Sequence, residues 1–371
     1  MFAKGQTVIS YMEQLAPKYL AVPDDRIGLQ LGSLQKEIKN ILVALDVNDE
    51  VVEEAIRIKA DLIVAHHAII FRPLKALNTD QPAGRLYEKL IKNDIAVYIS
   101  HTNLDTAEDG MNDWMAEALG IQSEGTLEDV HTEQLFKLVV FVPKTHHQRV
   151  LDAVLGAGAG HIGNYSHCSF NIDGYGTFVP GEGTQPFLGE PGKMERSEEV
   201  RIETIVPQGV RNKVVQAMLK AHPYEEVAYD LYHMDLQGRS FGLGRVGRLK
   251  EARTLREFVD VVKNGLNVEH VRVVGDLDRT IKKAAVLGGS GSRYVNKSLF
   301  KGADVLVTGD IDYHTAQDAL MAGIAIIDPG HNAEKIMKPK TAEWMRKRLA
   351  EGRYSTEVHV SQVETEPFQF L

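Results

Sequence analysis

The chain has 371 residues, which corresponds to two or three domains at roughly 100–200 residues per domain. Hydrophobic residues make up 43% and charged residues 25%, and the net charge is −9; these values exclude a disordered or fibrous chain and argue against a nucleic-acid or anionic-membrane binder, whose surface is basic. The chain has one cysteine, Cys168, which predicts a protein without disulfides. It shows no apolar run of membrane length and no secretory leader, so we expect a soluble, cytoplasmic protein.

Short apolar runs alternate with helical patterns near the start of the chain. We expect buried strands at residues 41–45, 62–64 and 95–99, and amphipathic helices at residues 51–56 and 86–91 between them. Strands that alternate with helices of about 10–15 residues are typical of βαβ units around a parallel sheet.

The middle of the chain, residues 132–234, contains an internal repeat with an offset of 64 residues. Residues 142–157 and 206–221 are identical at six of sixteen positions, and each copy predicts a strand that leads into a helix. A strand–helix–strand unit used twice indicates a ferredoxin-like fold. The glycine- and proline-rich segment 174–193 between the copies predicts a long hairpin or loop.

The rhythm of the first part returns near the end, where residues 284–287, 305–307 and 324–327 read as strands, each followed by a helical stretch. We therefore expect a Rossmann-like α/β domain with a parallel sheet, built from residues 1–130 and 237–371. We expect a ferredoxin-like α+β domain, residues 131–236, to be inserted into this α/β domain. Insertions are easiest at exposed loops, and the polar run at residues 124–133 suits such an insertion point.

Histidine and carboxylate side chains follow three of the predicted strands. His66 and His67 come directly after the strand at 62–64, and Asp105 follows the strand at 95–99. The last strand leads into His331 and Glu334, which are three residues apart and so share one face of a helical turn. Ligands bind outside the carboxyl ends of parallel strands, so we expect these side chains to converge. An isolated histidine pair would instead indicate one surface and one hydrogen-bonded core histidine.

This group of three imidazoles and two carboxylates matches the ligand chemistry of zinc, manganese or iron rather than that of calcium. It exceeds what one tetrahedral ion requires, and because a carboxylate can bridge, the count favours two ions about 3.5–4 Å apart. Further groups at strand ends are candidates for orienting the ligand histidines, namely Asp46, His101, Asp310 and His314.

Four other features have simpler readings. Asp312 is read as the cap of the helix that follows it. The glycine-rich segment 288–292 is either a phosphate-binding turn or only a tight strand-to-helix turn. The basic residues between 335 and 348 are read as a solvated helix face, and Cys168 as structural.

Five ordered motifs resemble the NIF-three-like family, whose members are often labelled GTP cyclohydrolase 1 type 2 homologs. The similarity covers about residues 1–125 and 240–371, and its motifs are residues 24–32, His66-His67, the Asp105 segment, Thr308-Gly309-Asp310 and Gly330-His331-x-x-Glu334. The resemblance implies a dinuclear metal centre with one or both carboxylates bridging, and a toroidal hexamer with the metal sites facing an internal cavity. The ligands that it implies are His66, His67, Asp105, His331 and Glu334. The first motif departs from the family pattern, which usually has Trp and Asn within residues 24–26.

The middle domain resembles CutA, a trimeric PII-like protein with a ferredoxin-like fold, through His222-Pro223-Tyr224-Glu225. By this resemblance the insert senses a small molecule, gates the cavity of the oligomer, or only packs the oligomer. His222, a lone histidine before a proline, is read as a turn residue rather than as a metal ligand.

Two functions fit these expectations. The first is a metal-dependent hydrolase that uses metal-activated water and two divalent ions per chain, with zinc expected first and iron or manganese as alternatives. Its substrate would be a nucleotide or phosphoester: the family label suggests ring opening of GTP, and a phosphoesterase fits equally well. The second is a non-enzymatic metal-binding regulatory or metal-handling homo-oligomer with a ligand-sensing PII-like insert. A metal-free scaffold is the third, simplest reading.

Overall fold

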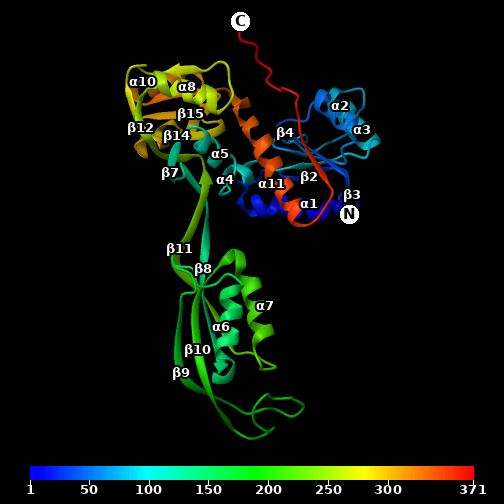
Figure 1. The fold of residues 1–371 in the computed structure, drawn as a ribbon, viewed down its shortest axis with the longest axis vertical. Helices are drawn as coiled ribbons and strands as arrows, with labels where there is room; N and C mark the ends of the chain where they lie inside the picture. The colour runs from blue at the N-terminus through cyan, green and yellow to red at the C-terminus, as the bar shows by residue number, and fades with distance from the viewer. The chain divides into compact units, whose positions relative to one another are not determined.

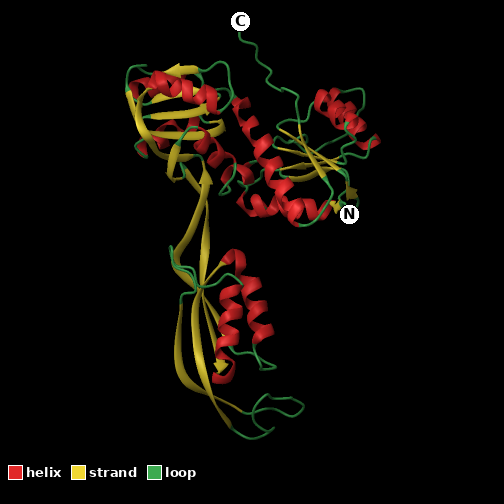
Figure 2. Ribbon diagram, in the orientation of Figure 1, coloured by secondary structure: helices red, strands yellow, loops and turns green.

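The computed structural model describes residues 1–371, and its elements are shown in Figures 1 and 2. The chain forms two compact units. Unit 1 combines residues 1–131 with residues 241–371, and unit 2 comprises residues 132–240. None of the helices combines the length and the apolar character that a membrane crossing requires.

The first sheet of unit 1 has five strands, of which four are parallel and one edge strand is antiparallel. Its order is β17 (Glu357–Val360), β4 (Asn40–Ala44), β5 (Leu62–Ala65), β6 (Ala96–Ile99) and β2 (Gly28–Leu31). Its three central strands, β4, β5 and β6, are nearly continuous apolar runs because both of their faces are covered. Helices α2 (Asp49–Arg57) and α3 (Pro82–Lys92) pack against one face, and α1 (Gly5–Leu15) and α11 (Met337–Glu351) against the other.

The second sheet of unit 1 has six strands with three parallel strands at its centre. Its order is β13 (Arg272–Val274), β16 (Ala325–Asp328), β15 (Val305–Gly309), β14 (Thr280–Ser290), β12 (Arg245–Thr254) and β7 (Ile121–Gly125). Helices α5 (Met111–Ala118) and α8 (Leu255–Gly265) cover one face, and α9 (Val295–Phe300) and α10 (Tyr313–Ala322) pack with the other. Unit 1 also contains α4 (Thr102–Thr106) and the small pair β1 (Ala3–Lys4) and β3 (Glu37–Ile38).

The expectation of one parallel sheet from both chain ends was therefore wrong in its topology. Each half contributes its own parallel core, and antiparallel strands form three of the four edges, namely β2, β7 and β13, whereas the edge strand β17 is parallel. The two halves still exchange strands, because β17 from the end of the chain pairs with β4, and β7 from the first half pairs with β12. Strands and helices alternate in the same way in one sheet or in two, so the sequence rhythm does not distinguish these arrangements.

Unit 2 is built on the repeat found in the sequence. Its elements run β8 (Glu128–Pro143), α6 (His147–Gly156), β9 (Ser169–Phe178), β10 (Glu195–Pro207), α7 (Arg211–Ala221) and β11 (Tyr229–Leu243), and the strand order is β11-β8-β10-β9. Both helices lie on one face of this sheet (Figure 2), where Val150 and Val214 pack with apolar side chains of β8 and β10. The expected boundaries after residues 130 and 236 fall inside β8 and β11, because each strand continues without a break past them.

Candidate metal centre

His66 and His67 lie at the carboxyl end of β5, where the chain turns. The backbone N–H groups of both residues donate to the carbonyl oxygen of Leu45, over 3.2 and 3.0 Å. This departure from strand geometry lets neighbouring side chains approach one site, whereas in a regular strand they would point to opposite faces. His66 is fully buried, and the two imidazole centroids are 5.1 Å apart.

The end of β6 contributes the next groups. His101 follows Ser100 at this strand end, and Asp105 lies on the short helix α4 with its side chain buried. The Asn112 side chain on α5 donates to the carbonyl oxygen of Asp105 over 2.9 Å and accepts from the N–H of Gly288 over 3.0 Å. One amide side chain thus ties the Asp105 segment to β14 of the second sheet.

His331 and Glu334 enter from the second sheet. The chain turns after β16 at Gly330, whose φ of 81° favours glycine, and continues as the 3₁₀ helix η5 (His331–Ile336). A β-carbon at Gly289 would lie 2.8 Å from Oε1 of Glu334. The glycine-rich end of β14 therefore makes room for the glutamate, which gives the segment 288–292 a role beside this cluster.

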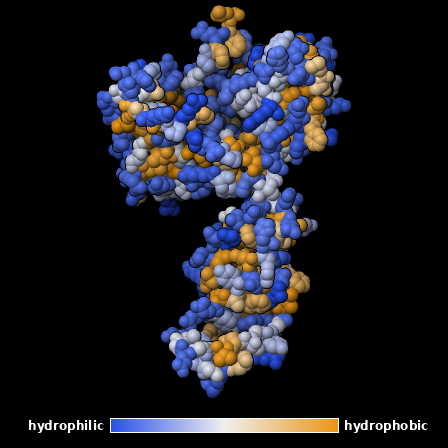
Figure 3. Space-filling model, turned by 180° about the vertical axis from the view of Figure 1, so that it is seen from behind, coloured by the Kyte–Doolittle hydropathy of each residue, from blue (hydrophilic) through white to orange (hydrophobic).

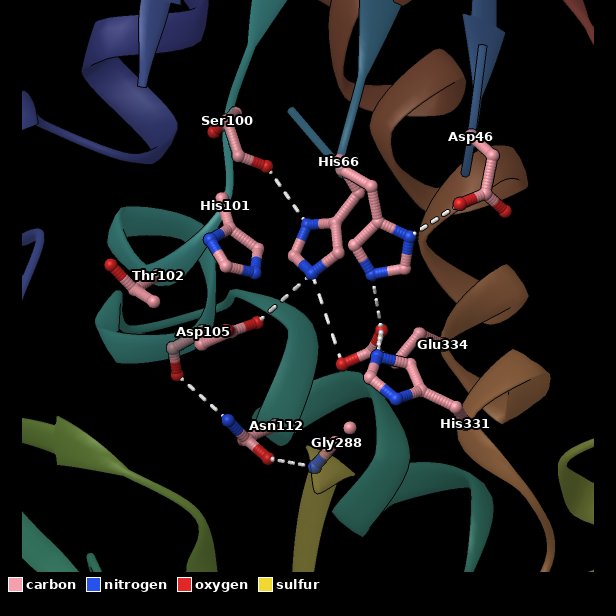
Figure 4. A network of polar contacts seen from close by, with 12 residues as sticks. Asp46, His66, Ser100, His101, Thr102, Asp105, Asn112, Gly288, His331 and Glu334 are labelled. Carbon is pink, nitrogen blue, oxygen red and sulfur yellow. Dashed lines mark hydrogen bonds and ion pairs between the residues drawn. The ribbon is translucent and has the colours of Figure 1, made fainter. Parts of the chain in front are cut away.

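The carboxylate of Glu334 lies at the centre of the cluster (Figure 4). Its Oε2 atom is 3.1 Å from Nε2 of His67 and 3.3 Å from Nε2 of His331. Its Oε1 atom is 3.8 Å from Nε2 of His66, which is also 3.6 Å from Oδ1 of Asp105. The structure thus brings together all five residues that the sequence singled out, from two sheets of unit 1.

His101 belongs to the same cluster, although we expected it only to orient another histidine. Ligand atoms of His66, His67 and His101 lie within 4.8 Å of one another. Two further groups satisfy the same criterion: His66 with Asp105 and Glu334, and His67 with His331 and Glu334. The position of His101 at a strand end was visible in the sequence, but its Nδ1 partner Asp25 is 76 residues away.

Each of the four histidines is held through its Nδ1 atom. For three of them the partner is a carboxylate: Asp46 at 2.7 Å from His67, Asp25 at 2.9 Å from His101 and Asp310 at 2.7 Å from His331. The Nδ1 atom of His66 lies 2.8 Å from the carbonyl oxygen of Ser100. Such partners fix the ring orientation and the tautomer of metal-ligating histidines, so that Nε2 is the atom directed at the cluster.

The donor set fits a divalent metal ion. Nε2 of His66 and Oδ1 of Asp105 are buried and have no hydrogen-bond partner. Buried polar atoms of this kind are rare and point to an ion or ligand that completes them. Imidazole nitrogens together with carboxylate oxygens are the ligands of zinc, iron and manganese.

The charged groups of the cluster shift one another's pKa values. Although burial opposes it, contacts with His331, His66 and His67 hold the pKa of Glu334 well below its usual range. Burial lowers the pKa of His67, but Asp46 and Glu334 outweigh it and raise that pKa to about 10. Glu334 and Asp310 raise the pKa of His331 to about 9. Burial raises the pKa of Asp105 to about 6.

The remaining candidates lie elsewhere or have local roles. Asp312 accepts from the N–H of Thr315 over 3.0 Å and caps α10, as expected. His314 is exposed on α10, with its ring 5.5 Å from that of Tyr313, and takes no part in the cluster. His222 in unit 2 lies 3.0 Å from the carbonyl oxygen of Phe141 and accepts from the N–H of Tyr224, which supports its reading as a turn residue.

A cavity of about 690 Å³ opens beside the cluster. His67, His331 and Asp310 line it on one side, and residues 365–370 near the end of the chain line another. Thr365 connects the second side with the cluster. Its hydroxyl donates over 2.5 Å to Oδ2 of Asp46, the carboxylate that holds His67. No serine or cysteine is among the lining residues.

Comparison with known proteins gives consistent matches over the whole chain. The sequence profile described as Duf34/NIF3 (NGG1p interacting factor 3) matches residues 3–367. Proteins called "GTP cyclohydrolase 1 type 2 homolog" from Halalkalibacterium halodurans and Bacillus subtilis are 54% and 51% identical, covering 100% and 99% of this chain and 99% and 98% of theirs. The crystal structure of a Bacillus cereus protein related to NIF3 is similar with a TM-score of 0.95, 51% identity and full coverage of both chains.

Proposed function

The chain belongs to the Duf34/NIF3 family, and from this premise we propose that unit 1 holds two divalent metal ions and acts as a metal-dependent hydrolase on a nucleotide or phosphoester. The observation that carries the proposal is the position of Glu334. Its two carboxylate oxygens face different histidines, Oε1 toward His66 and Oε2 toward His67 and His331. A carboxylate placed in this way suits a bridge between two ions.

The proposed ligands divide into two groups around that bridge. His66, His101 and Asp105 would hold one ion, and His67 and His331 the other, with Glu334 shared. Five of these six are the residues expected from the sequence, and His101 is added because its Nε2 atom is free while Asp25 holds its Nδ1 atom. The ions would supply Lewis-acid chemistry, lowering the pKa of water and polarising an electrophile. Zinc is the first candidate, and the same ligands accept iron or manganese.

The residues of the chain orient this site and bind the substrate. Asp46, Asp310 and Asp25 fix three of the imidazoles through hydrogen bonds at Nδ1. The adjoining cavity has the volume of a nucleotide-sized ligand and opens on His67 and His331. Because no serine or cysteine lines it, we assign the attacking group to water.

Metal analysis tests the binding part of this proposal. We would purify the protein without a histidine tag and without chelators, and measure the metal content per chain beside Asp105→Ala. About two ions per chain, with loss in the variant, is the expected result. No metal in either protein after soaking in zinc, iron and manganese would contradict it.

Turnover tests the catalytic part. Phosphodiesters, phosphomonoesters and GTP would be screened with the wild type, Glu334→Ala and the control Glu364→Gln. Glu364 contacts Lys335 at the surface and lies outside the cluster, so this control should keep full activity while Glu334→Ala loses it. Equal turnover in all three proteins would count against the site as the catalyst.

A metal-binding regulatory or metal-handling protein is the alternative, and unit 2 supports it. The order strand–helix–strand–strand–helix–strand, with the strand order β11-β8-β10-β9, is that of a ferredoxin-like domain. We propose that unit 2 is a CutA/PII-like domain, as its sequence resemblance suggests. The toroidal hexamer stays a prediction, and light scattering of the purified chain tests it.

A further inference from the structure

Unit 2 contains a cavity of its own, of about 480 Å³. Side chains of β9 and β10, the loop that follows β9 and the turn after α7 line it. Its lining residues include five aromatic side chains and three glutamates but no lysine, arginine or histidine. Two guanidinium groups lie near lining rings, that of Arg196 on Tyr175 and that of Arg201 5.9 Å from the ring of Phe141. Neither lines the wall, so the aromatic surface and the glutamates favour a cation over an anion.

Glu199 is the glutamate that the fold buries in this wall. It is 7% exposed and lies on β10. The hydroxyl of Tyr224 donates to its Oε1 atom over 2.8 Å, and the structure gives this carboxylate no ion pair. A β-carbon at Gly176 on the neighbouring strand would overlap Oε2 of Glu199, so the glycine makes room for the carboxylate. Buried carboxylates are costly unless a positive charge or several hydrogen bonds compensate them.

Aromatic rings surround the hydroxyl partner of Glu199. The ring of Tyr224 lies 6.0 Å from that of Phe178 and 6.2 Å from that of Phe187. The faces of such rings attract organic cations. Tyr175 is different, since its ring already stacks on the guanidinium of Arg196 at 3.7 Å.

The loop after β9 forms one wall of the cavity. Glu225 holds this loop by accepting from the N–H of Gln185 over 3.0 Å. Phe187 from the loop lines the cavity while remaining partly exposed, and apolar patches are visible on the surface of this unit in Figure 3. The loop therefore contributes an apolar wall that a ligand can reach from solvent.

We propose that this cavity is a binding site for a small organic cation, an ammonium group with an apolar body. The ammonium group pairs with Glu199, and the apolar body lies against Phe178, Phe187 and Tyr224. An anionic nucleotide does not fit, because no basic side chain lines the wall. The site is independent of the metal cluster, since all its residues belong to unit 2.

Three probes of one shape test the proposal on the full-length wild type: benzylammonium, the uncharged benzyl alcohol and the anionic benzoate, with ATP as a fourth titrant. We expect calorimetry to detect benzylammonium binding that is about tenfold or more tighter than that of benzyl alcohol. Neither benzoate nor ATP should bind at this cavity. Equal binding of the alcohol, or no binding of benzylammonium at millimolar concentration, overturns the proposal without any variant.

Glu199→Gln locates the site, with Glu198→Gln as its matched control. Glu198 is the next residue on β10, points to the other face and is largely exposed. We expect benzylammonium affinity to fall about tenfold in Glu199→Gln and to stay unchanged in Glu198→Gln, with equal melting temperatures. Unchanged affinity in Glu199→Gln would overturn the assignment. The other possible occupant is a basic side chain from a second copy of this chain. In that case Glu199→Gln would change the molar mass of the protein in solution, and the wild type would not bind the probe. This result would also overturn the proposal.

Discussion

Nε2 of His67 lies 3.1 Å from Oε2 of Glu334, although 267 residues separate them in the chain. His67 belongs to the end of the first sheet and Glu334 to the helix that follows the second. The cluster therefore forms only when both sheets of unit 1 are folded against each other. Metal binding should consequently be coupled to the folding of unit 1.

Removal of the metal should destabilise the wild type. A ligand that binds only the folded state stabilises it by about 2.7 kcal/mol at a concentration of 100 times its Kd. We expect a chelator to lower the melting temperature of metal-loaded wild type by several degrees. Glu334→Gln should show no such change, because it lacks the carboxylate that we propose as the shared ligand, whereas Glu364→Gln should behave as wild type. A chelator effect of equal size in Glu334→Gln would contradict the coupling.

Asp25 should determine how well His101 binds metal. Its carboxylate lies 2.9 Å from Nδ1 of His101 and also accepts from the N–H of Thr102. Loss of such a partner typically lowers metal affinity about 10–100-fold, so we expect this decrease in Asp25→Asn by competition with a chelating dye.

Asp24→Asn is the matched control for that variant. Asp24 is exposed and has a φ of 64°, a conformation that asparagine also tolerates. It removes the same charge from the neighbouring position and should leave metal affinity unchanged. Equal losses in the two variants would show a general charge effect instead of a positioning role for Asp25.

Metal affinity should rise with pH. In the metal-free protein the pKa is about 10 for His67 and about 9 for His331, both above the ordinary 6.5. Each imidazole therefore carries a proton at neutral pH that a metal ion must displace. We expect the apparent zinc affinity to increase between pH 6.5 and 8.5. A flat or falling profile would contradict the assignment.

The stability of the metal-free protein should change in the opposite direction. Because folding raises both pKa values, the stabilisation is complete below the unfolded value near 6.5 and is lost as the pH rises through 9 to 10. Asp310→Asn removes one cause of the raised pKa of His331. Zinc affinity should therefore rise less steeply with pH in Asp310→Asn than in the wild type. The same pH titration of zinc binding checks this expectation.

The sequence predicted the strands that carry the site better than the way in which they pair. A continuous apolar run such as residues 41–45 is typical of a strand in the interior of a sheet. The strand β4 lies in the interior of the first sheet, as expected. No local sequence pattern indicates that β14 pairs with β12 and β15 rather than with a strand of the first sheet. The proposed ligand role of His101 depends on Asp25, which lies 76 residues away in the sequence but 2.9 Å from its Nδ1 atom. Long-range partners of this kind have no local sequence signal, whereas the spacing of His331 and Glu334 does.

Gly289 should be necessary for the position of Glu334. Its φ is 65°, and a β-carbon there would lie 2.8 Å from Oε1 of Glu334. Gly289→Ala introduces backbone strain of order 1–3 kcal/mol and displaces the carboxylate. We therefore expect both lower stability and lower metal content.

Gly323→Ala separates these two effects. Gly323 ends α10 with a φ of 78°, and a β-carbon there would meet no atom within 4 Å. This control has the same kind of backbone strain without the contact to Glu334. It should lose stability comparably in urea denaturation but keep the wild-type metal content. If Gly323→Ala lost metal as Gly289→Ala does, the loss would come from strain in unit 1 and not from the displacement of Glu334.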